Sequence, residues 1–351
     1  MSVAHDAGSV AEAIERDSGA WDVAVMANHG HLLQSWRWGA FKEQFGWQVE
    51  RFAVPGAAGM ALAQVLFRHK AGVSIGYIPR GPVLASEDHE ARRALWARID
   101  RSARRRRALC IIVEPDTAAA ALAMAQLSLA PGPVPLQPAR TVKVALLDDD
   151  ALMAQMHSKT RYNVRMARRR EVAVWAATDT AASVDTFYEL LKDTASRNTF
   201  GVHAADYYRQ FLHHFGDDSL LLLAGVEQRT VAGVIAVKFG DEAIYMYGAS
   251  STKDRANGAG FLLQHEAMRW ARDRGATRYD MWGIPEFDPA TTVSESGDRL
   301  VGSTGADMRG LYEFKTRFGG EIVRYPVPLE RRYHPVLALL AKRLYGASGA
   351  D

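Results

Sequence analysis

The chain has 351 residues, a length that favours two compact domains. Its composition, with 48% hydrophobic and 24% charged residues, excludes a disordered or fibrous chain, and a single cysteine excludes a disulfide scaffold. The net charge is only +3, so any site for a large polyanion must come from local clusters of basic residues.

The sequence begins without the basic and apolar segments of a secretory signal, and no apolar run approaches the ~20 residues that cross a bilayer. The only cysteine, Cys110, lies in the apolar run 108–113, which predicts a buried strand and a packed, unreactive thiol. We therefore expect a cytoplasmic protein with at most peripheral membrane contact.

Two parts of the chain predict the same order of elements: a three-stranded meander, a helix and one more strand. Apolar β-branched runs between short turns favour strands, and the mixed-period segments between them favour helices. In the first part we expect strands ending at 52–54 and at 61–67, 73–77 and 108–113, with a helix at 88–107. In the second part we expect strands at 220–226, 231–238, 244–247 and 278–282, with a helix near 259–274.

This repeated order is similar to the core of the GNAT-type acyltransferases. It predicts an α/β fold with mixed sheets, built as two tandem GNAT-like domains, and a single large mixed domain is the alternative. An acidic helix-cap sequence begins at Asp148, directly after a strand-like run, so we place the domain boundary there.

Four further segments lie outside the repeat. Helices are expected at 183–197 and 204–215, before the second set of strands. Residues 286–309 are polar and rich in glycine, which predicts a functional or disordered loop. The apolar helix expected at 334–345 is too short to span a membrane, and we expect it to pack on the first domain rather than lie on lipid.

Two runs of arginine suggest anionic partners. In the helix expected at 158–170, with Ser158 as its cap, Arg161, Arg165 and Arg169 stack one turn apart. Like charges at this spacing destabilise a helix, so the stripe favours an anionic ligand over a solvated face neutralised by acids elsewhere. The second run, 104–107, either complements the dipole of its helix or extends a phosphate-binding surface.

Other residue patterns permit both a functional and a structural interpretation. Lys42 ends a short aromatic helix, where it is a ligand for phosphate or a surface lysine. Tyr245 and Tyr247 should share a strand face, because strand side chains alternate, and either orient a polar substrate or line a core. Lys315, beside Phe314, is a charge for an oxyanion or phosphate, or a residue of the helix surface.

The segment that contains Arg255, Gly258 and Gly260 opens a predicted helix and matches the pattern with which GNAT enzymes hold the pyrophosphate of coenzyme A. The sequence has no histidine pair or cysteine set with metal-ligand spacing, no nucleophile elbow and no Walker loop. We therefore expect no metal and no resident cofactor.

Taken together, these motifs resemble the FemABX family, the aminoacyl transferases that extend the peptidoglycan cross-bridge. The likeness is carried by residues in one order along the chain: Gln34, Ser35 and Lys42; 79–82; Lys159, Arg161, Asn163, Arg165 and Ala167; Tyr245, Tyr247 and Gly248; 279–284; and Leu311, Tyr312, Phe314, Lys315, Phe318, Gly319 and Gly320.

The resemblance implies that the second GNAT-like domain interrupts the first. The first, at 1–148 plus 325–351, would bind the precursor, and the second, at 149–324, would bind the aminoacyl donor and carry catalysis. The donor would be an aminoacyl-tRNA and the acceptor UDP-MurNAc-pentapeptide or lipid II. Some members have a coiled-coil arm in the second domain, and we expect none here.

The resemblance also implies roles for single residues. Catalysis would fall to Lys315, Phe314 and Tyr247, with Lys315 steadying the developing negative charge. Precursor binding would fall to Lys42, Trp38, Arg80, His203, Tyr207 and Tyr245, with His203 where relatives often have arginine. The tRNA contacts would be Arg161, Arg165 and Arg169.

No dedicated general base is visible in the sequence, so the acceptor's own carboxylate or phosphate is expected to take the proton. Asp280 and Glu286 are secondary candidates. An acyl-CoA-dependent N-acyltransferase, suggested by Arg255, Gly258 and Gly260, is the alternative function. A non-catalytic module that binds tRNA or precursor is the third.

Overall fold

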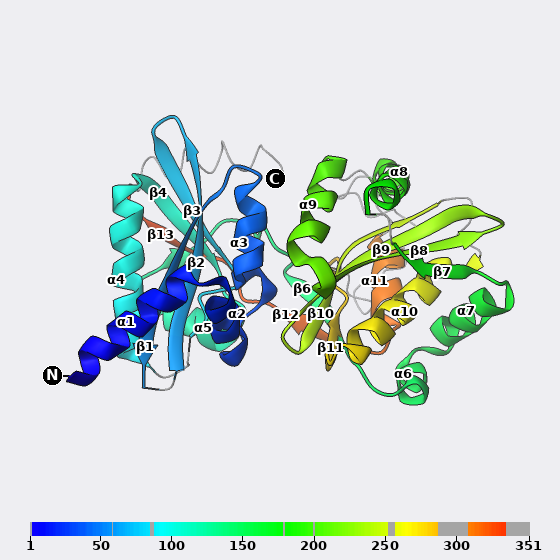
Figure 1. The fold of residues 1–351 in the computed structure, drawn as a ribbon, viewed down its shortest axis with the longest axis horizontal. Coiled ribbons are helices and arrows are strands. Elements are labelled where there is room, and N and C mark those ends of the chain that lie inside the picture. The colour runs from blue at the N-terminus through cyan, green and yellow to red at the C-terminus, as the bar shows by residue number, and fades with distance from the viewer. Residues whose placement is uncertain are drawn as a thin grey trace, which may run out of the picture. The chain divides into compact units, whose positions relative to one another are not determined.

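The computed structural model describes residues 2–57, 59–84, 88–177, 180–198, 201–251, 257–286 and 308–334 (Figure 1). Arg255, nearly all of the expected loop at 286–309 and nearly all of the expected helix at 334–345 lie outside these ranges. The chain divides into two compact units, the first formed by Met1–Ala139 with Tyr325–Asp351 and the second by Arg140–Arg324.

The first unit contains a six-stranded sheet in the order β1-β2-β3-β4-β13-β5. The strands are β1 (Gln48–Gly56), β2 (Gly59–Lys70), β3 (Val73–Pro79), β4 (Ala108–Glu114), β5 (Ala130–Pro131) and β13 (Leu329–Arg332). All neighbouring strands are antiparallel except β3 and β4. A parallel pair needs a crossover, which α4 (His89–Arg105) provides.

The sequence of α4 explains both its start and its packing. Asp88 caps the helix by accepting a hydrogen bond from the backbone N–H of Ala91 at 2.9 Å. Leu95, Trp96 and Ile99 follow at helical spacing, and all three are buried in the core of this unit. The remaining helices of the unit are α1 (Ser2–Arg16), α2 (Ser18–Ala27), η1 (Leu32–Gln34), α3 (Trp36–Glu43) and α5 (Ala118–Ala125).

The second unit contains a seven-stranded sheet in the order β12-β6-β11-β10-β9-β8-β7. The strands are β6 (Arg140–Ala145), β7 (Ala173–Ala176), β8 (Ser219–Val226), β9 (Arg229–Phe239), β10 (Glu242–Ser250), β11 (Arg278–Asp280) and β12 (Glu321–Arg324). The parallel pair is β10 and β11, and α10 (Ala259–Asp273) is its crossover.

Helices cover both faces of this second sheet (Figure 1). One face carries α8 (Thr180–Asn198) and α9 (Ala205–Phe215), and the other carries α7 (Ser158–Arg169) and α10. The other helical elements are α6 (Asp149–Gln155), η2 (Gly216–Asp218) and α11 (Met308–Thr316). The longest helix in the described part of this unit is α8, with 19 residues, so that part contains no coiled-coil arm.

Both units thus have three antiparallel strands, a helix and a parallel fourth strand, and the predicted α/β class with mixed sheets is confirmed. The change of unit comes at residues 139 and 140, earlier than the predicted boundary at 148. The physical reason is that β6 is hydrogen-bonded between β11 and β12 of the second sheet. In the part of the chain that the structure describes, no helix is long and apolar enough to cross a membrane.

Candidate functional site

In the first unit, α3 presents Lys42 beside two aromatic rings. Ser35 caps this helix, accepting a hydrogen bond from Trp38 N at 3.1 Å. The Lys42 ammonium lies 5.7 Å from the ring centre of Trp38 and 5.9 Å from that of Phe41, and the residue is only 7% exposed. Its charge is therefore held against aromatic faces rather than extended into solvent, unlike an ordinary surface lysine.

The segment before α3 is tied to the end of β3. The buried amide of Gln34 donates to Pro79 O at 2.7 Å and accepts from Gln64 N at 2.8 Å. Gly81 lies directly against this amide, because a Cβ there would stand 2.6 Å from Gln34 Cδ. The motif around Gln34 and the motif at 79–82 thus pack directly against each other in the first unit.

The contacts of Arg80 lie inside the protein and indicate a structural role. Its guanidinium stacks 3.3 Å from the ring centre of Tyr325 and donates to Pro138 O at 2.6 Å, and the side chain is 2% exposed. These contacts join the two places where the chain leaves and re-enters the first unit. Within this unit, the structure brings Lys42 and Trp38 together and occupies Arg80 with internal partners.

One buried carboxyl in the first unit was not singled out from the sequence. Glu114, at the end of β4, accepts hydrogen bonds from Tyr77 Oη at 2.9 Å, Leu136 N at 2.5 Å and Gln137 N at 3.1 Å. Burial raises the pKa of this carboxyl above its usual range. The only sequence signal was an acid at the end of an apolar strand.

In the second unit, Tyr245 and Tyr247 lie on opposite faces of β10, and the expectation that they share a face was wrong. The register with β9 shifts between them, so Tyr245 pairs with Ala236 while Tyr247 pairs with Ile235. A β-bulge adds one residue to a strand and so reverses the alternation of its side chains. Gly248 then lies under the Tyr245 ring, where a Cβ would be 1.7 Å from the phenol oxygen.

Tyr247 joins an aromatic cluster on the side of α9. Its ring centre lies 5.0 Å from Tyr208, 5.6 Å from Phe211 and 6.3 Å from Tyr207, in each case edge to face. His203 stacks on Tyr207 at 3.8 Å. Burial and the neighbouring phenols raise the pKa of Tyr247 well above its usual value, so it stays a neutral hydrogen-bonding group.

Tyr245 belongs to the opposite face, where Lys315 lies. The Lys315 ammonium, from the last turn of α11, is 5.1 Å from the ring centre of Tyr245. It donates to Gly283 O at 2.8 Å and is 8% exposed. Burial lowers the pKa of Lys315 to about 8. The neighbouring Phe314 packs edge to face on Phe261 and Phe318 and holds the helix in place.

Asp280 supports the position of Lys315. Its carboxylate is fully buried, accepts from Trp282 N at 2.6 Å and from Thr141 Oγ1, and lies 3.9 Å from the Lys143 ammonium. Trp282 has a φ of +56°, a left-handed conformation that costs a non-glycine residue about 1–2 kcal/mol. The hydrogen bond from Trp282 N to Asp280 therefore stabilises the turn that directs the Gly283 carbonyl at Lys315.

The secondary candidates for general base have different environments. Asp280 is completely buried and already accepts hydrogen bonds from two donors, which argues against a role in proton transfer and for one in positioning. Glu286 is exposed and is the last residue of the range 257–286 that the structure describes. The strand expected at 278–282 ends at Asp280, so Trp282 lies outside the strand.

The arginine stripe is only partly available to a ligand. His157, not the predicted Ser158, caps α7, with its ring nitrogen accepting from Lys159 N at 3.2 Å. Arg161 turns back and donates to Met156 O and, at 3.1 Å, to Ala154 O. Arg165 and Arg169 are exposed, and neither has an acidic partner among the described residues.

Gly258 has a packing role at the start of α10. It adopts a φ of +74°, and a Cβ there would lie 2.8 Å from Asn163 O of α7. Glycine is therefore required for the close approach of the two helices, whatever the segment binds. Gly260 has open space around it, with only Phe314 at 4.0 Å.

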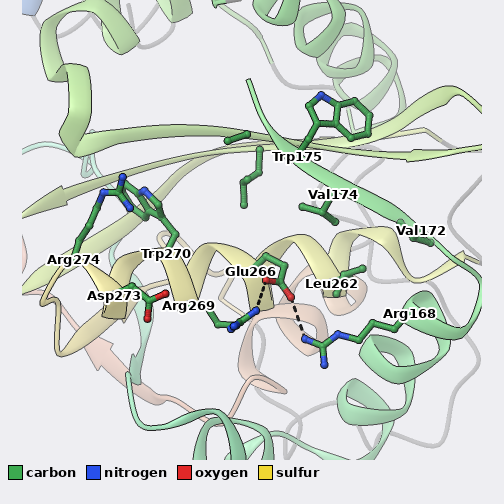
Figure 2. Close-up of a pocket in the computed structure, with 12 residues that line it drawn as sticks. Arg168, Val172, Val174, Trp175, Leu262, Glu266, Arg269, Trp270, Asp273 and Arg274 are labelled. Carbon is green, nitrogen blue, oxygen red and sulfur yellow. Dashed lines mark hydrogen bonds and ion pairs between the residues drawn. The ribbon is translucent and has the colours of Figure 1, made fainter. Parts of the chain in front are cut away.

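A groove of about 530 Å³ lies between α10 and β7, with Arg168 of α7 at one end (Figure 2). Glu266 accepts from Arg168 at 3.0 Å and from Arg269 at 2.9 Å. A hydrogen bond with His265, followed by these two arginines, lowers the pKa of its carboxyl to about 2. Trp175, 40% exposed, forms part of the opposite wall. None of the predicted catalytic or precursor-binding residues lines this groove.

Comparison with known proteins identifies the family. Residues 158–288 match the Acetyltransferase (GNAT) domain and residues 24–129 match the FemAB family. A Lipid II:glycine glycyltransferase of Staphylococcus aureus (strain MRSA252) is 25% identical over 354 positions, covering 76% of this chain and 83% of the relative. Together these matches support a FemABX family member with GNAT-like domains. They confirm the resemblance inferred from the motifs.

Solved structures agree with a FemABX fold. FemX has a TM-score of 0.79 at 21% identity, covering 92% of this chain and 98% of that structure. A tandem GNAT protein from the clavulanic acid biosynthesis pathway has a TM-score of 0.52 at 14% identity, covering 90% of this chain and 95% of its own. The predicted architecture of two tandem GNAT-like domains is therefore confirmed.

Proposed function

We propose that this FemABX protein transfers the aminoacyl group of an aminoacyl-tRNA to the side-chain amine of a peptidoglycan precursor stem peptide. The observation that carries the proposal is the similarity to Lipid II:glycine glycyltransferase, which covers 76% of this chain and so includes parts of both units. The name of this relative describes glycyl transfer to lipid II, a lipid-linked acceptor. The acceptor of this chain is either lipid II or the soluble UDP-MurNAc-pentapeptide.

The donor is already activated as an ester, so the main task of the enzyme is to position an amine against its carbonyl carbon. Holding two reactants in place is worth an effective molarity of about 10⁵–10⁸ M. The new C–N bond forms as the ester C–O bond breaks, and the ribose hydroxyl of the tRNA leaves. The amine loses one proton, which we assign first to the acceptor's own carboxylate or phosphate and then to the leaving ribose oxygen.

Lys315 stabilises the negative charge that develops on the carbonyl oxygen. With its pKa at about 8, this lysine is mainly protonated at neutral pH although it is buried. A fixed cation in a site with little water acts strongly on an oxyanion and needs no reorganisation during the reaction. Phe314 positions the same helix and Tyr245 shapes the surface beside the ammonium, whereas Tyr247 lies on the other face of β10.

The first unit binds the phosphates of the precursor through Lys42. The ammonium is nearly buried against Trp38 and Phe41, so its charge is less hydrated than that of an exposed lysine. The indole N–H of Trp38 is buried and has no hydrogen-bond partner among the described residues, so it is available as a second donor. We assign Tyr207 and His203 of the second unit to further precursor contacts.

The tRNA binds to α7 of the second unit. Arg165 and Arg169 are exposed one turn apart, and the Arg169 guanidinium lies 5.9 Å from the ring centre of the exposed Tyr162, two turns earlier on the same helix. Arginines interleaved with aromatic rings suit a nucleic-acid backbone and its bases. We assign Arg161 a smaller role in tRNA binding than the sequence suggested, because its guanidinium donates hydrogen bonds to backbone carbonyls just before the helix.

The direct experiment mixes the purified protein with a panel of aminoacyl-tRNAs and either UDP-MurNAc-pentapeptide or lipid II. Mass spectrometry should detect a precursor that is heavier by one amino acid residue. The Lys315→Met variant should bind both substrates and form far less product. Binding of both substrates without product from any aminoacyl-tRNA would contradict the proposal and favour a non-catalytic binding module.

Transfer from an acyl-CoA is the alternative, favoured by the match of residues 158–288 to the Acetyltransferase (GNAT) domain and by Gly258 and Gly260. Gly258 is already explained by its contact with α7, which removes part of that support. Calorimetry with acetyl-CoA separates the two functions. Micromolar binding would favour the acyl-CoA reaction and count against tRNA as the donor.

A further inference from the structure

One end of the first unit carries a group of basic side chains that the transfer reaction does not use. We name Lys70, Arg101, Arg104, Arg105 and Arg107 the basic end. The C-terminal end of α4 and the turn between β2 and β3 lie at the same end of the unit (Figure 1). They are joined there, because Ser74 donates to Arg107 O at 3.2 Å through its N–H and to Arg106 O at 2.9 Å through its hydroxyl.

The basic end has few acidic partners. The sequence from residue 101 to 107 contains five arginines and no acid. Arg106 is bound to Glu50 at 2.6 Å, and Arg104 lies over the Tyr333 ring at 5.4 Å. The other members of the basic end, Lys70, Arg101, Arg105 and Arg107, are exposed, and their side chains have no hydrogen-bond or ion-pair partner among the described residues.

The helix dipole accounts for only part of this group. Cations in the last turn stabilise a helix, which suits Arg104 and Arg105. The helix dipole does not explain Arg101, which lies one turn before Arg105 and is repelled by its like charge. Nor does it explain Lys70, which belongs to β2.

Arg107 stands where the fold favours glycine. It follows the C-cap of α4 with a φ of +51°, the left-handed position that ends many helices and usually holds glycine. Arginine is strained at such a position, and its side chain has no described partner that would compensate. The exposed arginine at this position adds one more charge to the basic end.

We propose that the basic end docks the protein on the anionic headgroups of a membrane surface. The described chain ends on this face, since His334 N donates to Leu109 O at 3.3 Å, two residues after Arg107. The sequence that follows, 335–345, is apolar except for Lys342 and Arg343; from the sequence we expected it to pack on the first domain, and beside the basic end the same composition also suits the interface of a bilayer. An RNA partner would not need that apolar sequence.

The reason for membrane docking rests on the proposed function, because a lipid-linked acceptor would be met at the membrane. The experiment that tests docking does not depend on that function. Each basic side chain near an anionic bilayer contributes about 1 kcal/mol, so one neutralised charge should weaken vesicle binding about fivefold. The interaction should weaken with salt as exposed charges become screened.

Co-sedimentation of the full chain with vesicles tests the proposal. We expect binding to phosphatidylcholine vesicles that contain phosphatidylglycerol, and little binding to phosphatidylcholine alone. Arg105→Glu should reduce the binding more than tenfold. Arg93→Glu is the matched control, since Arg93 is an exposed arginine of the same helix, more than two turns away from the basic end, and should leave binding unchanged. Equal losses in the two variants would overturn the proposal.

Arg107→Gly separates docking from folding. Glycine suits the left-handed position, so this variant should be at least as stable to heat as the natural protein and still bind vesicles about fivefold more weakly. Unchanged vesicle binding would overturn the proposal. So would loss of tRNA binding with vesicle binding intact, since the basic end would then be a nucleic-acid site. Vesicle binding without aminoacyl transfer would uphold the docking surface and refute only the proposed function.

Discussion

Replacing Asp280 tests the proposed role of Lys315 most directly. Asparagine has the shape of aspartate and keeps an oxygen that can accept from Trp282 N, so Asp280→Asn removes the charge with little change in geometry. The negative charge of Asp280 raises the pKa of Lys315, opposing the effect of burial. In the variant, the Lys315 pKa should therefore fall below about 8. Each unit of that fall corresponds to about 1.4 kcal/mol.

The pH dependence follows from the requirement for a protonated Lys315. In the natural protein, the transfer rate should decline as pH rises through about 8, where the ammonium loses its proton. In Asp280→Asn that decline should begin at lower pH. The assay measures kcat/KM for aminoacyl transfer over a pH series and takes the ratio of variant to natural protein, which cancels the titration of the acceptor amine.

Two further variants distinguish charge from geometry. Thr141→Val removes a hydroxyl donor to Asp280 without changing its charge, so the alkaline decline should stay in place. Asp280→Ala removes the acceptor for Trp282 N, a charged hydrogen bond of about 1.5–3 kcal/mol that outweighs the cost of the left-handed turn. Its kcat should fall about ten- to a hundredfold. An Asp280→Asn protein with the natural pH profile would refute the reasoning.

The remaining predictions concern stability and binding. Lys315→Met should raise the free energy of unfolding by up to about 3 kcal/mol, because the folded-state pKa of about 8 lies below the ordinary lysine value of 10.5. Urea titrations should find this gain at neutral pH and find it shrinking as pH rises from about 8 towards 10.5. Arg165→Glu combined with Arg169→Glu should weaken tRNA binding in filter assays and leave binding of the UDP-linked precursor unchanged; equal loss of both would argue against a dedicated tRNA surface. Lys42→Met should give the reverse pattern in the same assays, with precursor affinity reduced about tenfold or more. Gly248→Ala should destabilise the second unit by about 2 kcal/mol or more, measured by thermal unfolding, because a Cβ there would be 1.7 Å from the Tyr245 hydroxyl.

Local sequence patterns were sufficient for the order of the elements. The apolar runs predicted β1 to β4 of the first sheet and β8 to β11 of the second, but not the short strands β5, β7, β12 and β13. The spacing of Leu95, Trp96 and Ile99 follows the buried face of α4. These patterns work because burial of one face imposes a period of two on strands and 3.6 on helices. The buried Cys110 followed from the same argument.

The side-chain environments of the site required the folded chain. The sequence could not reveal that the register shift in β10 sends Tyr245 towards Lys315 and Tyr247 towards α9, because a bulge depends on how β10 pairs with β9. Arg161 was grouped with Arg165 and Arg169 by spacing alone, and only the position of the carbonyls before α7 separates them.

The sequence alone thus determined the resemblance to the FemABX family, the two repeated units and the residue types that carry charge, because these depend on local patterns along the chain. Tertiary structure alone decided that Asp280 supports Lys315 through Trp282 and Gly283, and that the end of the run at 101–107 is hydrogen-bonded to Ser74 at the start of β3. These contacts join residues that are distant in the chain, and their energies depend on burial and on the distances between the atoms involved.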